Sequence, residues 1–130
     1  MSEKFSYELD GAKAYEKLGI QGSTYQLSFQ EAEIMLGDIK GKTMLDFGSG
    51  TGRSTKWLKD LGASRVVGVD HDSAMVNQAN TDLEEGIEYK LIQGAIPLSD
   101  SSMDSAFSSQ VFMESRSIGD IKNAFAEISR

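Results

Sequence analysis

The feature that most constrains this chain is a run of alternating glycines, Gly48, Gly50 and Gly52, directly after a short apolar segment. That segment, residues 43–47, has the length of a β-strand, and the apolar positions from Trp57 onward have helical spacing. Glycines at every second position allow a tight turn, and they let a ligand approach the backbone because no Cβ intervenes. The first amides of the following helix are also available to a ligand. The pattern predicts a strand–loop–helix unit that either binds a ligand or is simply a glycine-rich turn.

A second apolar strand is predicted over residues 65–70, and it ends on an acidic residue, Asp70. Its β-branched, apolar composition is typical of a strand buried on both faces. If the two strands are neighbours in a parallel sheet, the Asp70 carboxylate lies beside the glycine loop and can accept hydrogen bonds from both hydroxyls of a ribose. Asp70 could instead cap the next helix, but Asp72 or Ser73 already supplies a cap there. We therefore favour the ribose-binding role.

Strands and helices alternate along the chain from residue 41 onward. Further strands are predicted over Ile87–Gln93 and Met103–Phe112, with helices over Met75–Leu83 and from Ile118 to the last residue. This alternation is typical of βαβ units with right-handed crossovers. We predict an α/β fold with an open, doubly wound, Rossmann-like parallel sheet, whose ligand crevice lies at the carboxyl ends of the strands.

Residues 1–40 are predicted to form N-terminal helices that precede a core domain over residues 41–130. Apolar and small residues recur at helical spacing between Tyr7 and Leu18. Ser28 and Glu31 fit a capping box, so a helix is expected to begin at Ser28 and to end near Gly37.

The composition excludes several classes of function. Thirteen Lys plus Arg against 20 Asp plus Glu give a net charge of −7, which argues against nucleic acid or an anionic membrane as a partner. The chain has no cysteine and one histidine, His71, so thiolate and multi-histidine metal sites are excluded and no metal is expected. No apolar run approaches the ~18 residues of a membrane span. The start of the chain lacks the apolar stretch of a signal peptide, so a cytoplasmic location is expected.

Three motifs in order resemble those of the class I S-adenosylmethionine-dependent methyltransferases. The resemblance is closest to the small-molecule (type 11) branch that includes the ubiquinone and menaquinone biosynthesis methyltransferases. The motifs are Leu45–Gly52, Val67–Met75 and Ile96–Asp104, and the similarity extends from Gly41 to about Arg130. It implies S-adenosylmethionine as cofactor, a small-molecule methyl acceptor and a sheet with the strand order 3-2-1-4.

The same resemblance implies a cofactor-binding site. Asp46 would face the methionine ammonium, and Gly48 and Gly50 would line the methionine and ribose. Asp70 would hold the ribose hydroxyls, and His71 would lie against the adenine. The other predicted cofactor-binding residues are Ser49, Gly52, Gln93, Gly94 and Ser108. A cleft with carboxylates suits a sulfonium cofactor, which is cationic at sulfur and ammonium, better than a phosphate cradle would.

The methyl acceptor is predicted to lie near Gln110 and three tyrosines of the N-terminal segment, Tyr7, Tyr15 and Tyr25. In related enzymes such a segment covers the site as a lid, although tyrosines at these positions could equally serve in packing. No catalytic residue is predicted, because in-line methyl transfer from a sulfonium depends mainly on positioning and exclusion of water.

The chain departs from the family pattern at three places. Residues 93–97 form a shortened segment without the acidic residue that usually lies near the adenine. Glu114 stands where many members carry histidine. The resemblance also stops after the fourth strand, where the family's sheet continues, so the core is expected to be incomplete. An apolar edge such as Val111–Met113 invites pairing, and a second copy of the chain is expected to cover it.

Two alternatives to a methyltransferase remain open. Gly48, Gly50 and Asp70 would also suit an NAD-dependent dehydrogenase, but that fingerprint requires a small residue where the chain has Arg53. The other alternative is an incomplete, non-catalytic cofactor-binding module, because strands after the fourth usually help to enclose the substrate. A P-loop nucleotide hydrolase is less favoured still, since no Gly-Lys-Ser or Gly-Lys-Thr is present.

Overall fold

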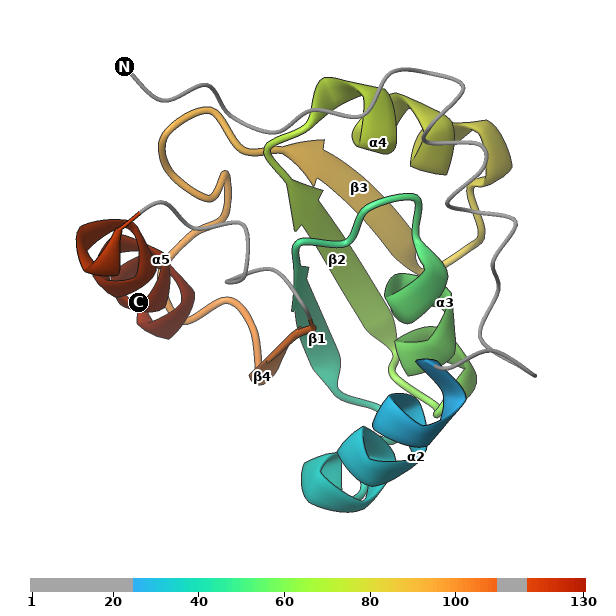
Figure 1. The fold of residues 1–130 in the computed structure, drawn as a ribbon. Coiled ribbons are helices and arrows are strands. Elements are labelled where there is room, and N and C mark those ends of the chain that lie inside the picture. Colours follow the sequence, from blue (N-terminus) through green and yellow to red (C-terminus); the bar gives the residue numbers. More distant parts are fainter. Residues whose placement is uncertain (1–24, 110–116) are drawn as a thin grey trace.

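A four-stranded parallel sheet with the order β3-β2-β1-β4 forms the centre of the chain (Figure 1). The computed structural model describes residues 25–109 and 117–130. The strands are β1 (Thr43–Phe47), β2 (Arg65–Asp70), β3 (Ile87–Leu91) and β4 (Ser105–Ser108). The predicted α/β fold and its 3-2-1-4 strand order are therefore confirmed.

Helices pack on both faces of this sheet, because side chains alternate between the faces along each strand (Figure 1). On one face, Met44 and Val66 pack against Leu58 of α3 (Arg53–Asp60), and Ile87 packs beside α4 (Ser73–Ala79). On the other face, Leu45, Val67 and Val69 form a cluster that includes Ile128 of α5. Helix α5 spans Ile118–Ser129. This is the doubly wound arrangement that the sequence predicts.

Helix α2 (Tyr25–Leu36) is fixed to the α3 side of the sheet by aromatic contacts. The Phe29 ring meets Trp57 edge-on, with ring centroids 4.6 Å apart, and lies 6.1 Å from Phe107. The helix ends before Gly37, as predicted, but it begins at Tyr25 rather than at Ser28. The predicted capping box is therefore wrong. Packing of Phe29 stabilises the first half of the helix, so Ser28 lies inside the helix and not at its start.

Three other elements are shorter or differently bounded than predicted. β3 ends at Leu91 instead of Gln93, because the chain turns there and Gln93 pairs back with Ala95. β4 begins at Ser105 instead of Met103, and residues 110–112 of the predicted strand lie outside the described residues. Helix α4 ends at Ala79 and continues as the 3₁₀ helix η1 (Asn80–Asp82), which leaves Leu83 outside it.

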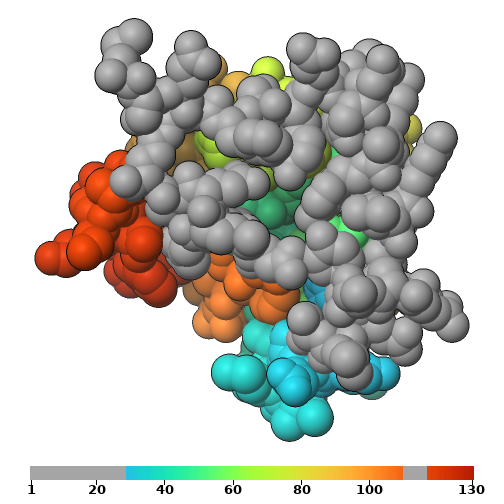
Figure 2. All heavy atoms as spheres, viewed as in Figure 1, coloured from blue at the N-terminus to red at the C-terminus, as the bar shows by residue number. Residues whose placement is uncertain are grey.

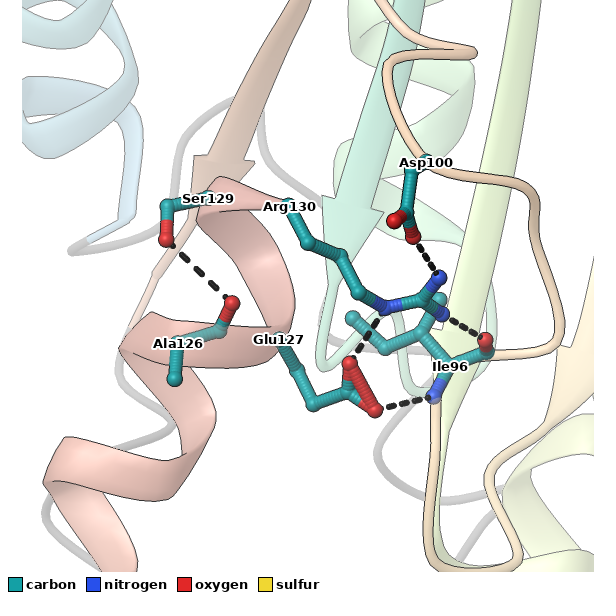
Figure 3. Close-up of polar contacts among 6 residues, drawn as sticks. All are labelled: Ile96, Asp100, Ala126, Glu127, Ser129 and Arg130. Carbon is teal, nitrogen blue, oxygen red and sulfur yellow. Dashed lines mark hydrogen bonds and ion pairs between the residues drawn. The ribbon is translucent and has the colours of Figure 1, made fainter.

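The last turn of α5 is joined to the loop between β3 and β4 by a group of polar contacts (Figure 3). Arg130 donates hydrogen bonds to the carboxylates of Asp100 and Glu127 and to the carbonyl of Ile96. Glu127 also accepts a hydrogen bond from the Ile96 amide. These contacts hold α5 against the face of the sheet that carries Leu45, Val67 and Val69. No helix in the described parts of the chain is both long enough and apolar enough to cross a membrane.

The first prediction concerns the packing of α3. Leu58 has no exposed surface, so we expect Leu58→Ala to lower the free energy of unfolding by about 2–5 kcal/mol through lost burial and a residual cavity. Urea unfolding followed by the fluorescence of Trp57, the single tryptophan, measures this loss. The control is Met35→Ala, because Met35 is 88% exposed and its removal should change stability by less than about 0.5 kcal/mol. Equal losses in both variants would contradict this assignment of the core.

Candidate cofactor-binding site

The glycine loop after β1 is bound to the carboxyl end of β2. The amides of Gly48 and Ser49 both donate to the Val69 carbonyl, at 2.7 and 3.0 Å. The amide of Gly50 donates to Oδ2 of Asp70 at 2.9 Å. The loop and the Asp70 carboxylate are thus in direct contact, as expected if β1 and β2 are neighbouring parallel strands.

The turn itself requires glycine. Gly48, Gly50 and Gly52 have φ angles of 81°, 56° and 101°, in the left-handed region that side chains with a Cβ rarely adopt. Gly52 is followed at once by α3, so the loop ends at the amides of a helix N-terminus. A ligand at this edge of the sheet would therefore meet bare backbone.

Asp46, in β1, is the most deeply buried charged residue near the loop, with 1% of its surface exposed. Its Oδ2 accepts hydrogen bonds from Ser54 (2.6 Å) and Thr55 (2.7 Å), while Oδ1 has no partner among the described residues. Burial raises the pKa of this carboxyl from 3.8 to about 6, the two hydroxyls oppose the rise, and the charge of Asp70 adds to it. A buried carboxylate oxygen without a donor suits a cationic group of a ligand.

Unpartnered buried oxygens gather around this loop. In the described residues, side-chain oxygens that are buried without a hydrogen-bond partner belong to Asp46, Ser49, Thr51, Tyr89 and Ser108. Ser49 and Thr51 are loop residues, and Ser108 is the register partner of Phe47 at the end of β1. Buried polar atoms in proteins usually have partners, so their concentration here indicates a place where a polar ligand binds.

Asp70 is 8% exposed and already fixed in orientation. Its Oδ1 accepts from the Asp72 amide at 2.9 Å, and its Oδ2 accepts from Gly50. Each carboxylate oxygen has a second lone pair, so both can still accept from a ligand hydroxyl. Asp72, not Asp70, caps α4 through the amides of Ala74 and Met75, as predicted.

The other predicted cofactor residues follow the ends of β2 and β3. His71 is partly exposed, and its Nδ1 lies 3.6 Å from Oδ1 of Asp70. The Ile92 amide donates to the Asp70 carbonyl, which brings the exposed Gln93 and Gly94 to the same edge of the sheet. The predicted cofactor-binding residues therefore share the carboxyl edge of the sheet, but their contacts with a cofactor remain predictions.

Most residues predicted to lie near the methyl acceptor are outside the described part of the chain. Tyr7, Tyr15, Gln110 and Glu114 lie outside the described residues, and only the backbone of Tyr25 is described. Ser54 and Thr55 were missed in the sequence analysis, although two adjacent hydroxyl residues, separated by one residue from the last glycine of the loop, were a visible signal. In the described residues, no three His, Asp or Glu side chains lie close enough together to hold a metal ion.

The chain matches the family described as "Methyltransferase domain" over residues 45–130. This chain belongs to that methyltransferase family. The domain is 33% identical over 97 residues to a demethylmenaquinone methyltransferase of Tropheryma whipplei, covering 72% of this chain and 40% of that protein.

Solved structures agree with this family. An S-adenosylmethionine-dependent methyltransferase from Mesorhizobium loti superposes with a TM-score of 0.62 at 28% identity, covering 72% of this chain and 43% of that one. A methyltransferase of the same cofactor class from Aquifex aeolicus gives a TM-score of 0.73 over 95% of this chain and 68% of its own. At 21% identity, the second likeness concerns the fold alone. The domain thus spans about two fifths of the length of its curated relative and of the Mesorhizobium enzyme.

The residues of this candidate site suit S-adenosylmethionine by their chemistry. Oδ1 of Asp46 suits an ammonium, the oxygens of Asp70 suit vicinal hydroxyls, and the glycines allow close approach of the backbone. The carboxylates of Asp46 and Asp70 would complement a cation and would repel a phosphate.

The second prediction concerns the ionisation of Asp46. Since folding raises its pKa from 3.8 to about 6, the folded chain holds a proton between these pH values that the unfolded chain releases. The contribution of this protonation to the free energy of unfolding is therefore complete below about pH 4 and is lost as the pH rises through 6. For a pKa raised by about two units the loss is roughly 3 kcal/mol. We expect Asp46→Asn, which does not titrate, to gain stability relative to wild type between pH 4 and pH 7, measured by urea unfolding.

Asn123→Ala is the control, because Asn123 is exposed on α5 and neither asparagine nor alanine titrates. Its stability difference from wild type should stay constant across this pH range. A constant difference for Asp46→Asn as well would show that Asp46 ionises equally in the folded and unfolded chain.

Proposed function

We propose that this methyltransferase domain binds S-adenosylmethionine at the glycine loop and contributes to transfer of its methyl group to a small molecule. The observation that carries the proposal is the contact between the loop and Asp70, next to the unpartnered Oδ1 of buried Asp46. The named cofactor of the Mesorhizobium relative, which is 28% identical, supports the same cofactor here.

Each group of the site is proposed to bind one part of the cofactor. Asp46 binds the methionine ammonium, directly or through water, and Gly48 and Gly50 line the chain between methionine and ribose. Asp70 accepts from the ribose hydroxyls, and His71 lies against the adenine. Ser49, Gly52, Gln93, Gly94 and Ser108 complete the proposed binding surface. These roles agree with the positions of these residues at the carboxyl edge of the sheet.

The bound cofactor supplies an electrophilic methyl group with a neutral thioether as leaving group. The protein's contribution is to fix the direction of the transfer and to exclude water, rather than to provide a nucleophile. Anchors at Asp46 and Asp70, on adjacent strands, would hold the two ends of the cofactor rigidly. Residues 1–24, with Tyr7 and Tyr15, are proposed as a lid that helps to enclose the acceptor, together with Tyr25 and Gln110. The remainder of the predicted lid, residues 1–40, includes Phe29 and Ile39, which pack in the core on the α3 side of the sheet.

A small molecule is the proposed methyl acceptor. The net charge of −7 opposes binding to nucleic acid, and a relative at 33% identity is a demethylmenaquinone methyltransferase. The same acidic, cysteine-free composition supports the cytoplasm as the compartment.

The third prediction tests the cofactor by calorimetric titration. We expect S-adenosylmethionine to release binding heat and NAD to release none. Asp70→Ala should weaken binding of S-adenosylmethionine by about 1.5–3 kcal/mol, the usual contribution of hydrogen bonds to a charged group. Binding heat with NAD alone would identify a dinucleotide site and would overturn the proposal.

Asp104→Ala is the matched control for this substitution. Asp104 also accepts a hydrogen bond from a backbone amide, that of Thr43 at 2.8 Å, but it does so at the opposite end of β1. Its removal should lower stability without changing cofactor affinity. An equal loss of affinity in both variants would mean that Asp70 acts only through the fold.

We also propose that the outer edge of β4 pairs with a second copy of this chain. β4 pairs with β1 along one side, and in the described residues no strand pairs with its other side. Its segment reaches the surface between α5 and α2 (Figure 2). Exposed strand edges readily pair with another chain. The fourth prediction is a dimer whose population rises with concentration in light scattering, and a monomer at high concentration would contradict it.

A further inference from the structure

We propose that Gly68 and Tyr89 are positioning residues, which set the height of the glycine loop above the sheet and thereby the geometry of the cofactor site. The expected effect on cofactor affinity rests on the proposed function. The contacts from which the inference is argued are all between residues of this chain. Neither residue is among the predicted binding residues, and neither is proposed to touch the cofactor.

The two residues occupy one row across the sheet. In the strand register, Asp46 of β1 is the partner of Gly68 in β2, and Gly68 is the partner of Tyr89 in β3. Side chains of one row point to the same face, and here that face carries α3 and α4. The row therefore places a carboxylate, an empty position and an aromatic ring side by side directly beneath the loop.

The empty position at Gly68 is filled by the loop. A Cβ on Gly68 would lie 2.8 Å from Cβ and 2.9 Å from Oγ of Ser49, and 2.9 Å from Cδ1 of Tyr89. These distances are too short for contacts of a Cβ atom, so only glycine at position 68 allows Ser49 to lie this close to β2. The φ angle of Gly68 is not in the left-handed region, so the restriction comes from space and not from backbone strain.

Tyr89 supports the other end of the loop. A Cβ on Gly52 would lie 2.1 Å from the Tyr89 hydroxyl oxygen and 2.8 Å from Cζ. The Tyr89 hydroxyl is buried and is one of the oxygens without a hydrogen-bond partner. Burial raises the pKa of this phenol, and the nearby charge of Asp46 adds to the rise, so the side chain stays neutral. The ring thus acts as a rigid support that contacts the glycine from which α3 begins.

Together the two contacts fix both ends of a loop whose amides bind Val69 and Asp70. Ser49 rests on Gly68, and Gly52 rests on Tyr89, with Gly50 between them donating to Asp70. Raising Ser49 would lengthen the bonds from Gly48 and Ser49 to the Val69 carbonyl, which are 2.7 and 3.0 Å. A methyl group at position 68 should therefore displace the cofactor site without touching the cofactor.

The fifth prediction is that Gly68→Ala binds S-adenosylmethionine at least about five-fold more weakly than wild type, because an added methyl overpacks a close-packed region. Affinity is measured by calorimetry on protein shown to be folded by its Trp57 fluorescence. Gly119→Ala on α5 is the matched control, since its Cβ would meet only Ser117 Oγ, at an ordinary 3.5 Å, and affinity should not change.

Ser49→Gly removes the two loop atoms that the new methyl group meets and leaves its contact with Cδ1 of Tyr89 in place, so it provides a partial rescue. Ser49→Gly alone measures the contribution of the serine itself. We expect Gly68→Ala to weaken binding clearly less in the Ser49→Gly background than in wild type. A merely structural role for Gly68 would instead give the same loss of affinity in both backgrounds, and this result would overturn the proposal.

Amide hydrogen exchange of the peptide that covers residues 48–52 tests the same inference without any ligand. Exchange in Gly68→Ala should be at least about five-fold faster than in wild type, and Ser49→Gly should reduce this acceleration. Unchanged exchange would overturn the positioning role. If wild type binds no S-adenosylmethionine while exchange responds as described, the proposed function fails and the positioning role stands.

Discussion

The site depends on one set of hydrogen bonds, those that join the glycine loop to the end of β2. Two loop amides share the Val69 carbonyl, and a third reaches the Asp70 carboxylate. The amides of Ser49 and Gly50 are buried, and each buried amide without a partner would destabilise the turn. By satisfying them with the neighbouring strand, the chain joins the first βα turn to the second strand. The two features with which a ligand would interact are thereby held in one rigid unit.

This arrangement places two carboxylates close to one another, and their burial opposes folding. Asp46 is desolvated and feels the charge of Asp70, and the hydroxyls of Ser54 and Thr55 compensate only in part, since its pKa remains raised. A purely structural position would be served by an uncharged residue. A buried carboxylate with one unpartnered oxygen agrees with the proposed binding of the methionine ammonium by Asp46.

The sequence was sufficient for the parts of the fold that depend on local patterns. Residues 43–47 and 65–70 are confirmed as strands, because apolar runs of that length between glycines and helices have few alternatives. The contact of the loop with Asp70 was also predictable, since parallel order alone brings the two strand ends together. The start of α2 was not, because it depends on Phe29 packing against Trp57, a contact between distant segments. Ser28 satisfied a local capping rule that this packing overrides.

Gly68 shows why the remainder of the site could not be predicted from the sequence without the three-dimensional structure. In the sequence it is a glycine inside a strand, where it weakens the strand and signals only that some backbone or ligand comes close. Which group comes close depends on the register of three strands and on the path of the loop, and neither is encoded within residues 65–70. The structure identifies the group as Ser49, with Tyr89 at its side. Gly68, which looks like a local defect in β2, therefore leaves the space into which the glycine loop fits. Its proposed effect on cofactor affinity is exerted through that loop.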